Sequence, residues 1–236
     1  MMNQRDRRAF IRAGLIAGVS TFAGARLLRA AEEKKPGEGE QEEEVSPSED
    51  LMREHGVLKR ILLIYEEAIR RLRAKEDLPP EAISDSAGII RHFIEDYHEK
   101  LEENFLFPRF ERAGQLVELV KTLRLQHARG RDVTNLTLQL AKTPALREPD
   151  DRARLSDLMH QFIRMYSPHE AREDTVLFPA FRRLVSTNEY ESLVEDFEKK
   201  EHELFGEDGF ESMVEKVAGI EKRLGIYDLA QFTPKI

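Results

Sequence analysis

The sequence predicts an all-α protein, an antiparallel four-helix bundle followed by additional C-terminal helices. Four long stretches between residues 48 and 186 place apolar or bundle-facing side chains at alternating steps of four and three, which is the spacing of one buried helical face. No stretch shows sustained period-two alternation with hairpin signals, so strands are not expected. Prolines and glycines separate the stretches by short loops, and long helices joined by short loops form antiparallel bundles.

The first two helices are separated by Pro79 and Pro80. The first begins after the segment Ser46 to Asp50, and its predicted buried face consists of Leu51, His55, Leu58, Leu62, Tyr65, Ile69 and Leu72. The second runs from about residue 81 through 107, with Ile94, His98, Leu101 and Phe105 on the same kind of face. Because proline cannot continue a helix, the pair should end one helix and start the next.

Gly114 marks the junction to the third helix, and Pro144 and Pro149 bracket the loop before the fourth. The predicted buried face of the third helix carries Leu116, Val120, Leu123 and His127. That of the fourth carries Phe162, Tyr166, His169, Glu173, Val176 and Ala180. Residues 188 to 225 add two weaker helical stretches, divided near Gly206 and Gly209, which we expect to pack on the outside of the bundle.

An internal repeat relates the two halves of the predicted bundle. The segment HEKLEENFLFPRF at 98–110 matches HEAREDTVLFPAF at 169–181 at the first His, the next Glu, the Glu of each His-x-x-x-Glu and Leu-Phe-Pro-x-Phe. One further histidine precedes each block, His55 before the first and His127 before the second, with nearly the same spacing. The bundle therefore reads as two helical hairpins, each with one lone His and one His-x-x-x-Glu.

Helical geometry gives this repeat a chemical meaning. Residues four apart project from nearly the same side of a helix, so His98 can act with Glu102, and His169 with Glu173. With the two lone histidines, four imidazoles and two carboxylates point into one interior. Unpaired carboxylates in a core are very costly, and a divalent or trivalent metal removes that cost. Six such ligands suit a two-metal site with bridging carboxylates, with iron favoured and manganese or zinc as the next candidates.

The composition excludes several classes of site and function. The chain has 236 residues, no Cys and seven His, which excludes disulfide scaffolds, zinc ribbons, iron–sulfur ligation and thiol catalysis. Any metal must be held by nitrogen and oxygen. The formal net charge of −8 argues against a generic nucleic-acid binder.

The ordered set of His, His-x-x-x-Glu, His, His-x-x-x-Glu resembles the hemerythrin-like, or HHE cation-binding, proteins. The resemblance covers about residues 48 to 186 and includes the Leu-Phe-Pro after each acidic motif. It implies a non-haem di-iron centre with two iron ions and both glutamates bridging. The ligands that it implies are His55, His98, Glu102, His127, His169 and Glu173.

Two positions depart from the oxygen-carrying members of that family. Their second third-helix imidazole is missing, because Leu123 and Arg131 stand four positions before and after His127. Their last carboxylate is an Asp five positions after the fourth-helix His, where this chain has Asp174. We favour Glu173, which repeats Glu102, since a five-residue step rotates a side chain by about 140°.

Several further residues remain open at this stage. The missing imidazole leaves a coordination position for water, substrate or another residue, and His202 is a candidate for it. Glu99 and Glu170, each next to a ligand histidine, either join the site or serve as solvent-facing or supporting carboxylates. His92 and His160 lie off the predicted buried face, and we expect them either at the surface or in contacts that support the ligands.

Residues 1–31 read as an export signal. They carry six Arg and one acid, so they hold +5 of the total −8 and leave −13 for the remainder. A thirteen-residue apolar stretch, residues 13–25, has the size of a signal-peptide core and is too short to span a bilayer. Residues 32–47 are an acidic linker with almost nothing apolar, which predicts disorder.

The leader also indicates a route. Its pattern Arg-Arg-x-Phe-Ile-Arg at 7–12 resembles the twin-arginine signal, with an ordinary secretory leader as the alternative. Cleavage after Ala25 or after Ala31 would place the protein in the periplasm or elsewhere outside the cytoplasm, without a stable membrane anchor. The expected organisation is thus a signal peptide at 1–31, a linker at 32–47, the bundle at 48–186 and a C-terminal extension at 187–236.

Three functions fit these features. The leading hypothesis is an exported di-iron protein that binds O₂ or a related small molecule such as peroxide or NO. The second is a redox enzyme that reduces peroxide or NO, or oxidises a substrate, at the extra coordination position. The third is an iron-storage or sensing module without turnover. The sequence does not decide between carrier and enzyme.

Overall fold

The structure is a computed structural model that describes residues 45–142 and 148–235. The predicted signal peptide and nearly all of the predicted linker lie outside these residues. Within them all regular structure is helical, with no strand, so the prediction of an all-α fold is confirmed. No helix in the described part is long and apolar enough to cross a membrane.

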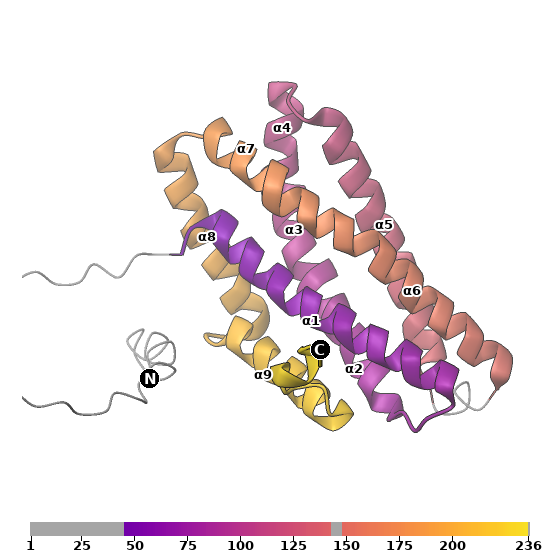
Figure 1. Cartoon of the computed structure of the whole chain (residues 1–236). Helices are drawn as coiled ribbons and strands as arrows, with labels where there is room; N and C mark the ends of the chain where they lie inside the picture. Colours follow the sequence, from indigo (N-terminus) through magenta and orange to yellow (C-terminus); the bar gives the residue numbers. More distant parts are fainter. Residues whose placement is uncertain (1–44, 143–147, 236) are drawn as a thin grey trace, which may run out of the picture. The chain divides into compact units, whose positions relative to one another are not determined.

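Four helical runs form the bundle, and Figure 1 shows how they are arranged. The first is α1 (Pro47–Ala74) and the third is α5 (Val117–Leu140). The second run consists of α2 (Pro80–Ile89), η2 (Ile90–His98), α3 (Glu99–Leu101), η3 (Glu102–Leu106) and α4 (Phe107–Ala113). The fourth consists of α6 (Pro149–Arg172), η5 (Glu173–Leu177) and α7 (Phe178–Leu184). The first run packs against the second and fourth, and α5 closes the ring against the same two.

The ends of the runs follow from local sequence. Ser46 caps α1 by accepting a hydrogen bond from the Glu49 N–H at 3.3 Å, and Pro47 stands in the first turn, where its missing N–H costs nothing. Gly114 ends α4 with φ +65°, a conformation that glycine adopts without steric cost. These caps hold the runs to fixed lengths and keep their connections short.

The second and fourth runs are not uniform α-helices. At η3 the N–H of Phe107 bonds to the carbonyl of Glu102, and at η5 the N–H of Phe178 bonds to that of Glu173, both five positions back. These two π-helical segments each come just before a proline, Pro108 or Pro179, whereas the π-helical segment η2 does not. A proline inside a helix lacks a donor and clashes with the carbonyl four positions earlier, and at these two positions the wider turn accommodates it.

Because of this wider turn, the predicted buried face is wrong beyond Glu102 and Glu173. The strict four-and-three spacing placed Phe105, Val176 and Ala180 in the core, but all three are only half-buried. The fully buried residues stand one position later and include Leu106, Leu177 and Phe181. A π-helical segment adds one residue to the turn, so the face that points inward moves by one position.

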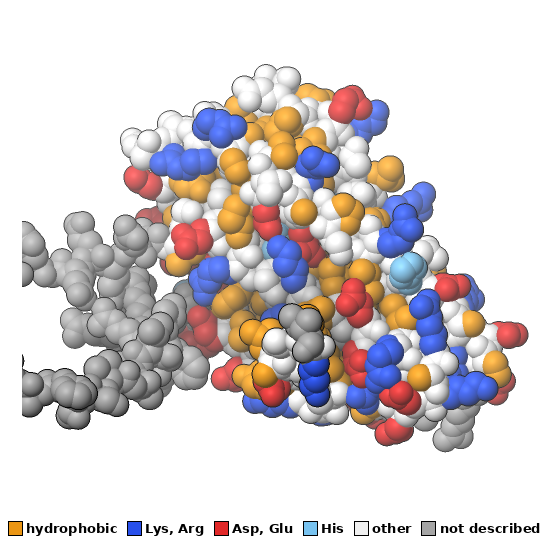
Figure 2. Space-filling view, in the orientation of Figure 1, with side chains coloured by type: hydrophobic (Ala, Val, Ile, Leu, Met, Phe, Trp, Pro, Cys, Tyr) orange, Lys and Arg blue, Asp and Glu red, His pale blue; other side chains and the backbone are white. Residues whose placement is uncertain are grey.

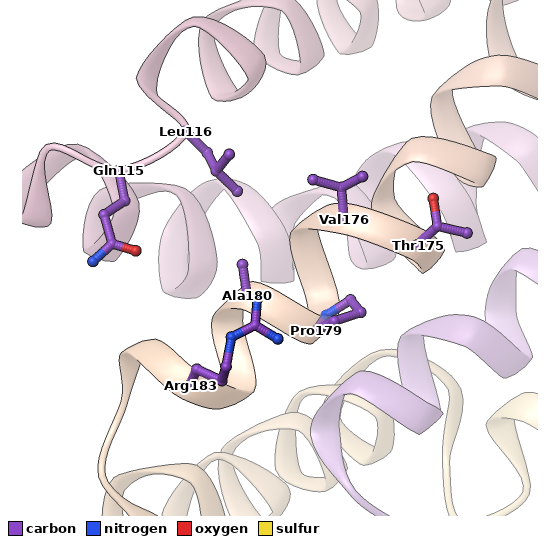
Figure 3. A pocket seen from close by; sticks show the side chains of 7 residues that line it. All are labelled: Gln115, Leu116, Thr175, Val176, Pro179, Ala180 and Arg183. Atoms are coloured by element: carbon purple, nitrogen blue, oxygen red, sulfur yellow. The ribbon is translucent and has the colours of Figure 1, made fainter.

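Val176 and Ala180 instead line a surface pocket of about 490 Å³. Figure 3 shows them beside Leu116 and Pro179, with Arg183 at the edge. The predicted core residue Leu116 is therefore also only half-buried. It has φ +49°, an unusual value for a bulky residue, where the chain turns from α4 into α5.

The C-terminal segment adds α8 (Thr187–Phe205), α9 (Gly209–Leu224) and the short 3₁₀ helix η6 (Leu229–Phe232). The helices α8 and α9 both pack on α1, and α9 also packs on α2. The guanidinium of Arg60 on α1 binds Glu221 on α9 through two hydrogen bonds of 2.9 and 2.5 Å. Acidic and basic side chains are interspersed over the face in Figure 2.

Candidate metal centre

The six predicted ligands meet in the middle of the bundle. They come from all four helical runs, and each side chain is almost fully buried, with the largest residue exposure being 4% for His169. His55 lies on α1 and His127 on α5, while the other four stand at the ends of regular helical segments. Those four are His98 at the end of η2, Glu102 at the start of η3, His169 near the end of α6 and Glu173 at the start of η5.

All four imidazoles present their Nε2 atoms to the two glutamates. One oxygen of Glu102 lies 3.8 Å from Nε2 of His98 and 3.4 Å from that of His127. One oxygen of Glu173 lies 3.4 Å from Nε2 of His55 and 3.1 Å from that of His169. Metal–ligand bonds of about 2.1 Å place neighbouring ligand atoms roughly 3.0–3.4 Å apart. The observed separations, apart from the longer one to His98, fall near that range.

The donors divide into two overlapping groups. Glu102, His127, His169 and Glu173 have donor atoms within 4.8 Å of one another, and so do His55, His98 and Glu102. The imidazoles pair in the same way, since the ring centroids of His55 and His98 lie 4.7 Å apart and those of His127 and His169 lie 5.0 Å apart. Glu102 belongs to both groups, which is the placement that a bridging carboxylate requires.

The donor atoms also lack other partners. Neither oxygen of Glu102, neither oxygen of Glu173, nor Nε2 of His127 has a hydrogen bond to any residue that the structure describes. Buried carboxylates without such partners cost several kcal/mol each. A cation at the centre would offset this cost, so the residues present fit a resident metal.

The Nδ1 atoms of the imidazoles point outward to four acceptors. His98 lies 2.6 Å from Glu54, and His169 lies 2.9 Å from the side-chain carbonyl of Gln126. The two lone histidines have acidic partners as well, His55 with Asp174 at 2.7 Å and His127 with Glu103 at 3.1 Å. Such contacts fix the ring tautomer, so that Nδ1 carries the proton and Nε2 keeps its lone pair for a metal.

The sequence analysis did not identify these acceptors, although the repeat contains a signal for them. Glu54 and Gln126 each precede the lone histidine of their half. Glu103 and Asp174 each follow the glutamate of the His-x-x-x-Glu motif. Repeated polar residues next to repeated ligands were therefore candidates for the supporting contacts.

Two phenylalanines of the Leu-Phe-Pro motifs cover the lone histidines. Phe178 stacks on His55 with ring centroids 5.5 Å apart, and Phe107 stacks on His127 at the same distance. Each ring comes from the opposite repeat to the histidine it covers. Together they make the outer walls of the site apolar, which excludes water from the donors.

Burial controls the protonation of two imidazoles. It lowers the pKa of His127 to about 4, although Glu103 opposes the shift. Burial, reinforced by neighbouring His55, also holds the pKa of His98 well below its usual range. Both rings are thus neutral at ordinary pH and available as ligands. For His55, burial lowers the pKa, but Asp174 and Glu173 outweigh it and raise the pKa to about 9.

The pKa values of the two central glutamates are shifted in opposite directions. Burial and the nearby charge of Glu173 raise the pKa of Glu102 well above its usual range. Burial acts on Glu173 too, but His169 and His55 outweigh it and hold the pKa of Glu173 well below its usual range. Without a cation, the pair therefore keeps one proton on Glu102, because two adjacent buried carboxylates resist joint ionisation.

The residues left open by the sequence now have positions. Asp174 does not take the place of the last carboxylate ligand, because it contacts the outward Nδ1 of His55. Glu173 contacts the inward Nε2 of the same ring. His202 is exposed on α8 and supplies no imidazole to the centre. Glu99 and Glu170 are 1% and 0% exposed, so the expectation that they face solvent was wrong.

Arg131 stands where an additional imidazole would be expected on α5, and it binds acids instead. Its guanidinium lies 2.6 Å from Glu99 and 2.7 Å from Glu103. The hydroxyl of Tyr166 donates to the other oxygen of Glu99 at 2.6 Å, and its ring lies 5.2 Å from that of His169. Glu99, Glu103 and His127 also group together, but both acids already pair with this arginine.

Comparison with known proteins agrees with this arrangement. The family described as the hemerythrin HHE cation binding domain matches residues 46–153 and again residues 119–234. The chain belongs to the hemerythrin HHE family. Its bundle is therefore a hemerythrin-like fold, and the family resemblance predicted from the repeat is confirmed. Cation binding within a helical bundle is the property that the family description carries.

Close relatives of this HHE protein occur in mycobacteria. An uncharacterized protein of Mycobacterium bovis and uncharacterized proteins from two strains of Mycobacterium tuberculosis are each 50% identical over 242 residues, covering 99% of this chain and 95% of the relative. The similarity spans the whole length, including the segment before the bundle. No solved structure matches the chain significantly.

Proposed function

We propose that this HHE protein is an exported, non-haem di-iron protein that binds O₂ or a related small molecule such as peroxide or NO. The observation that carries the proposal is the buried set of four Nε2 atoms around two carboxylates without hydrogen-bond partners. Mixed imidazole and carboxylate donors favour iron, with manganese or zinc next. Bound iron would supply the redox chemistry, while the chain's residues hold it and shield it.

The residues around the donors define what the protein itself contributes. Four outward acceptors fix the imidazole orientation, and Phe107 and Phe178 keep solvent from the donors. The two halves together contribute four imidazoles, which is one fewer than in the oxygen-carrying members of the family. The position left by the missing imidazole supports a binding site for a small exogenous ligand at the metal.

The test is the metal content of the purified protein together with its absorption spectrum before and after O₂ reaches the reduced form. We expect about two iron ions per chain and a charge-transfer band on oxygenation. The variant His98→Ala should lose metal, whereas His92→Ala should keep it, because His92 is exposed. Protein that carries no metal, or one tightly bound zinc, would refute the proposal.

A redox enzyme is the second candidate, favoured by the network of Tyr166, Glu99 and Arg131 beside His169. Turnover with peroxide or NO, lost in Glu102→Gln and kept in His92→Ala, would indicate an enzyme. A band that reverses when O₂ is removed would indicate a carrier. Metal-dependent folding without either property would indicate storage or sensing.

We also propose export by the twin-arginine machinery to the periplasm or another compartment outside the cytoplasm. The paired arginines and the short apolar stretch at 7–25 support it. A reporter fused to residues 1–31 should be exported, and replacing both Arg7 and Arg8 by Lys should abolish this. Export that persists in the double variant would point to the ordinary secretory route.

A further inference from the structure

The surface pocket lies in a groove between the start of α5 and the fourth helical run, which we call the α5 groove. The pocket is lined by the turn before α5, by η5 and by α7, and no third helix of the described chain contributes to it. Figure 3 shows Leu116 on one side, with Val176, Pro179 and Ala180 on the other and Arg183 at the edge. Its volume of about 490 Å³ leaves room for a large side chain from outside.

The equivalent groove in the first half, between α1 and the second helical run, is covered by α8. The contacts of α8 with the second run combine aromatic rings and an ion pair. They are Phe197 with Phe105, ring centroids 5.5 Å apart, Phe205 with Tyr97, at 5.4 Å, and Glu189 with Arg109, at 2.8 Å. Acidic side chains outnumber basic ones in α8. An acidic helix with aromatic anchors therefore closes this α1 groove.

The repeat relates the two grooves residue by residue, and it shows why the α5 groove contains a pocket. Phe105 aligns with Val176, and Arg109 aligns with Ala180. Phe105 and Arg109 are large and contact α8, whereas the aligned side chains are short and line the pocket. Among the described residues, the α5 groove thus lacks both large side chains at these positions and a covering helix.

The α5 groove also carries positive charge without partners. Phe93 on the second run contacts Phe205 of α8, with ring centroids 5.6 Å apart. The residue that aligns with Phe93 is Arg164, which is exposed. Neither Arg164 nor Arg183 forms an ion pair with any residue that the structure describes. Among the described residues that line the pocket none is acidic, so the groove is complementary to a negatively charged partner.

We propose that the α5 groove docks an acidic amphipathic helix of a partner protein, with an aromatic side chain of that helix in the pocket and its carboxylates facing Arg164 and Arg183. The α1 groove supplies the template, because α8 covers it with the same chemistry. Helices bind grooves through apolar anchors spaced along one face. None of the six predicted metal ligands lines the pocket, so the inference is independent of the proposed function.

A labelled synthetic peptide with the sequence of α8, residues 187–205, is the probe, and the full chain is the receptor. Fluorescence anisotropy should show saturable binding at the α5 groove, since the chain's own α8 already fills the α1 groove. A peptide with Phe197→Ala should bind about tenfold more weakly or worse, because an aromatic anchor in a pocket carries a large share of the binding free energy.

Variants of the receptor locate the binding site. Arg183→Glu should weaken peptide binding by about tenfold or more, because it places a carboxylate beside an acidic helix. Ala180→Glu should weaken it too, since it partly fills the pocket and adds the same repulsion. Arg183 is exposed, so its variant supplies the test if Ala180→Glu does not fold. The matched control is Arg73→Glu, which changes an exposed arginine near the end of α1, at the other end of the bundle (Figure 1), and should leave binding unchanged.

The results that would overturn the inference are distinct. Absence of saturable binding to the wild type would do so, and so would binding that Arg183→Glu leaves unchanged, because the peptide would then occupy another surface. If sedimentation shows that the wild type self-associates and that Ala180→Glu abolishes this, a second copy of the chain fills the groove and the partner helix is refuted. The metal content of the variants reports separately on the proposed function.

Discussion

The close approach of Tyr166 to Gly130 predicts that a larger residue at position 130 destabilises the protein near the metal centre. Gly130 lies inside α5, where alanine is ordinarily better by about 1 kcal/mol. A Cβ at this position would lie 2.1 Å from the Tyr166 hydroxyl and 2.9 Å from two of its ring carbons. The glycine therefore leaves space for a phenol that donates to buried Glu99.

The variant Gly130→Ala must displace this ring or the helix. The tyrosine has little freedom, since it stacks on Phe162 with centroids 4.3 Å apart. Overpacking costs about 1–3 kcal/mol. Burial raises the pKa of Glu99 to about 8, so weakening its hydrogen bond to the phenol adds about 0.5–1.5 kcal/mol, the value for an uncharged pair. After subtracting about 1 kcal/mol for the gain in helix propensity, we expect a net loss of about 0.5–3.5 kcal/mol.

Urea unfolding of the metal-free protein measures this loss. Gly219→Ala in α9 is the matched control, because its Cβ meets nothing within 4 Å and should stabilise by about 0.5–1 kcal/mol. In a Tyr166→Phe background the penalty of Gly130→Ala should shrink without vanishing, since the ring carbons remain close. A Gly130→Ala protein as stable as the wild type would refute the reasoning.

Three further predictions concern the metal. Glu102→Gln removes the carboxylate shared by both donor groups, so elemental analysis should find fewer than two ions per chain; an unchanged content of two would contradict this. Chelation should lower Tm, because ligand at about 1,000 times its Kd contributes about 4 kcal/mol; the same Tm with and without metal would argue against a resident ion. Affinity, measured by competition with a chelator, should rise from pH 6 towards pH 9. Over that window the cation must displace protons from Glu102, whose pKa is raised, and from His55, whose pKa is about 9, so a pH-independent affinity would exclude this protonation scheme.

Much of the fold could be predicted because the information is local. Ser46, Pro79 and Gly114 set helix ends through the backbone next to them, and the apolar spacing shows which face turns inward. The one systematic error lies beyond Glu102 and Glu173, where fixed α-helical periodicity does not include the extra residue of a π-helical turn. Pro108 and Pro179 follow those two turns, but a proline alone does not predict one, since Pro168 lies inside the regular helix α6.

The metal ligands could be predicted from the sequence, whereas the residues that accept hydrogen bonds from the histidine Nδ1 atoms could not. The repeated His-x-x-x-Glu places two donors by helical geometry alone. The acceptor of an outward Nδ1 depends on how distant helices pack: Asp174 is 119 residues from His55, and Glu54 is 44 residues from His98. Tyr166 reaching Glu99 across 67 residues is a contact of the same kind.

The stacking of Phe178 on His55 and of Phe107 on His127 shows that the two hairpins depend on each other. Each hairpin carries a histidine whose covering ring and outward acid both belong to the other hairpin. One hairpin alone would lack both partners of its lone histidine, so neither hairpin can form its part of the metal centre by itself.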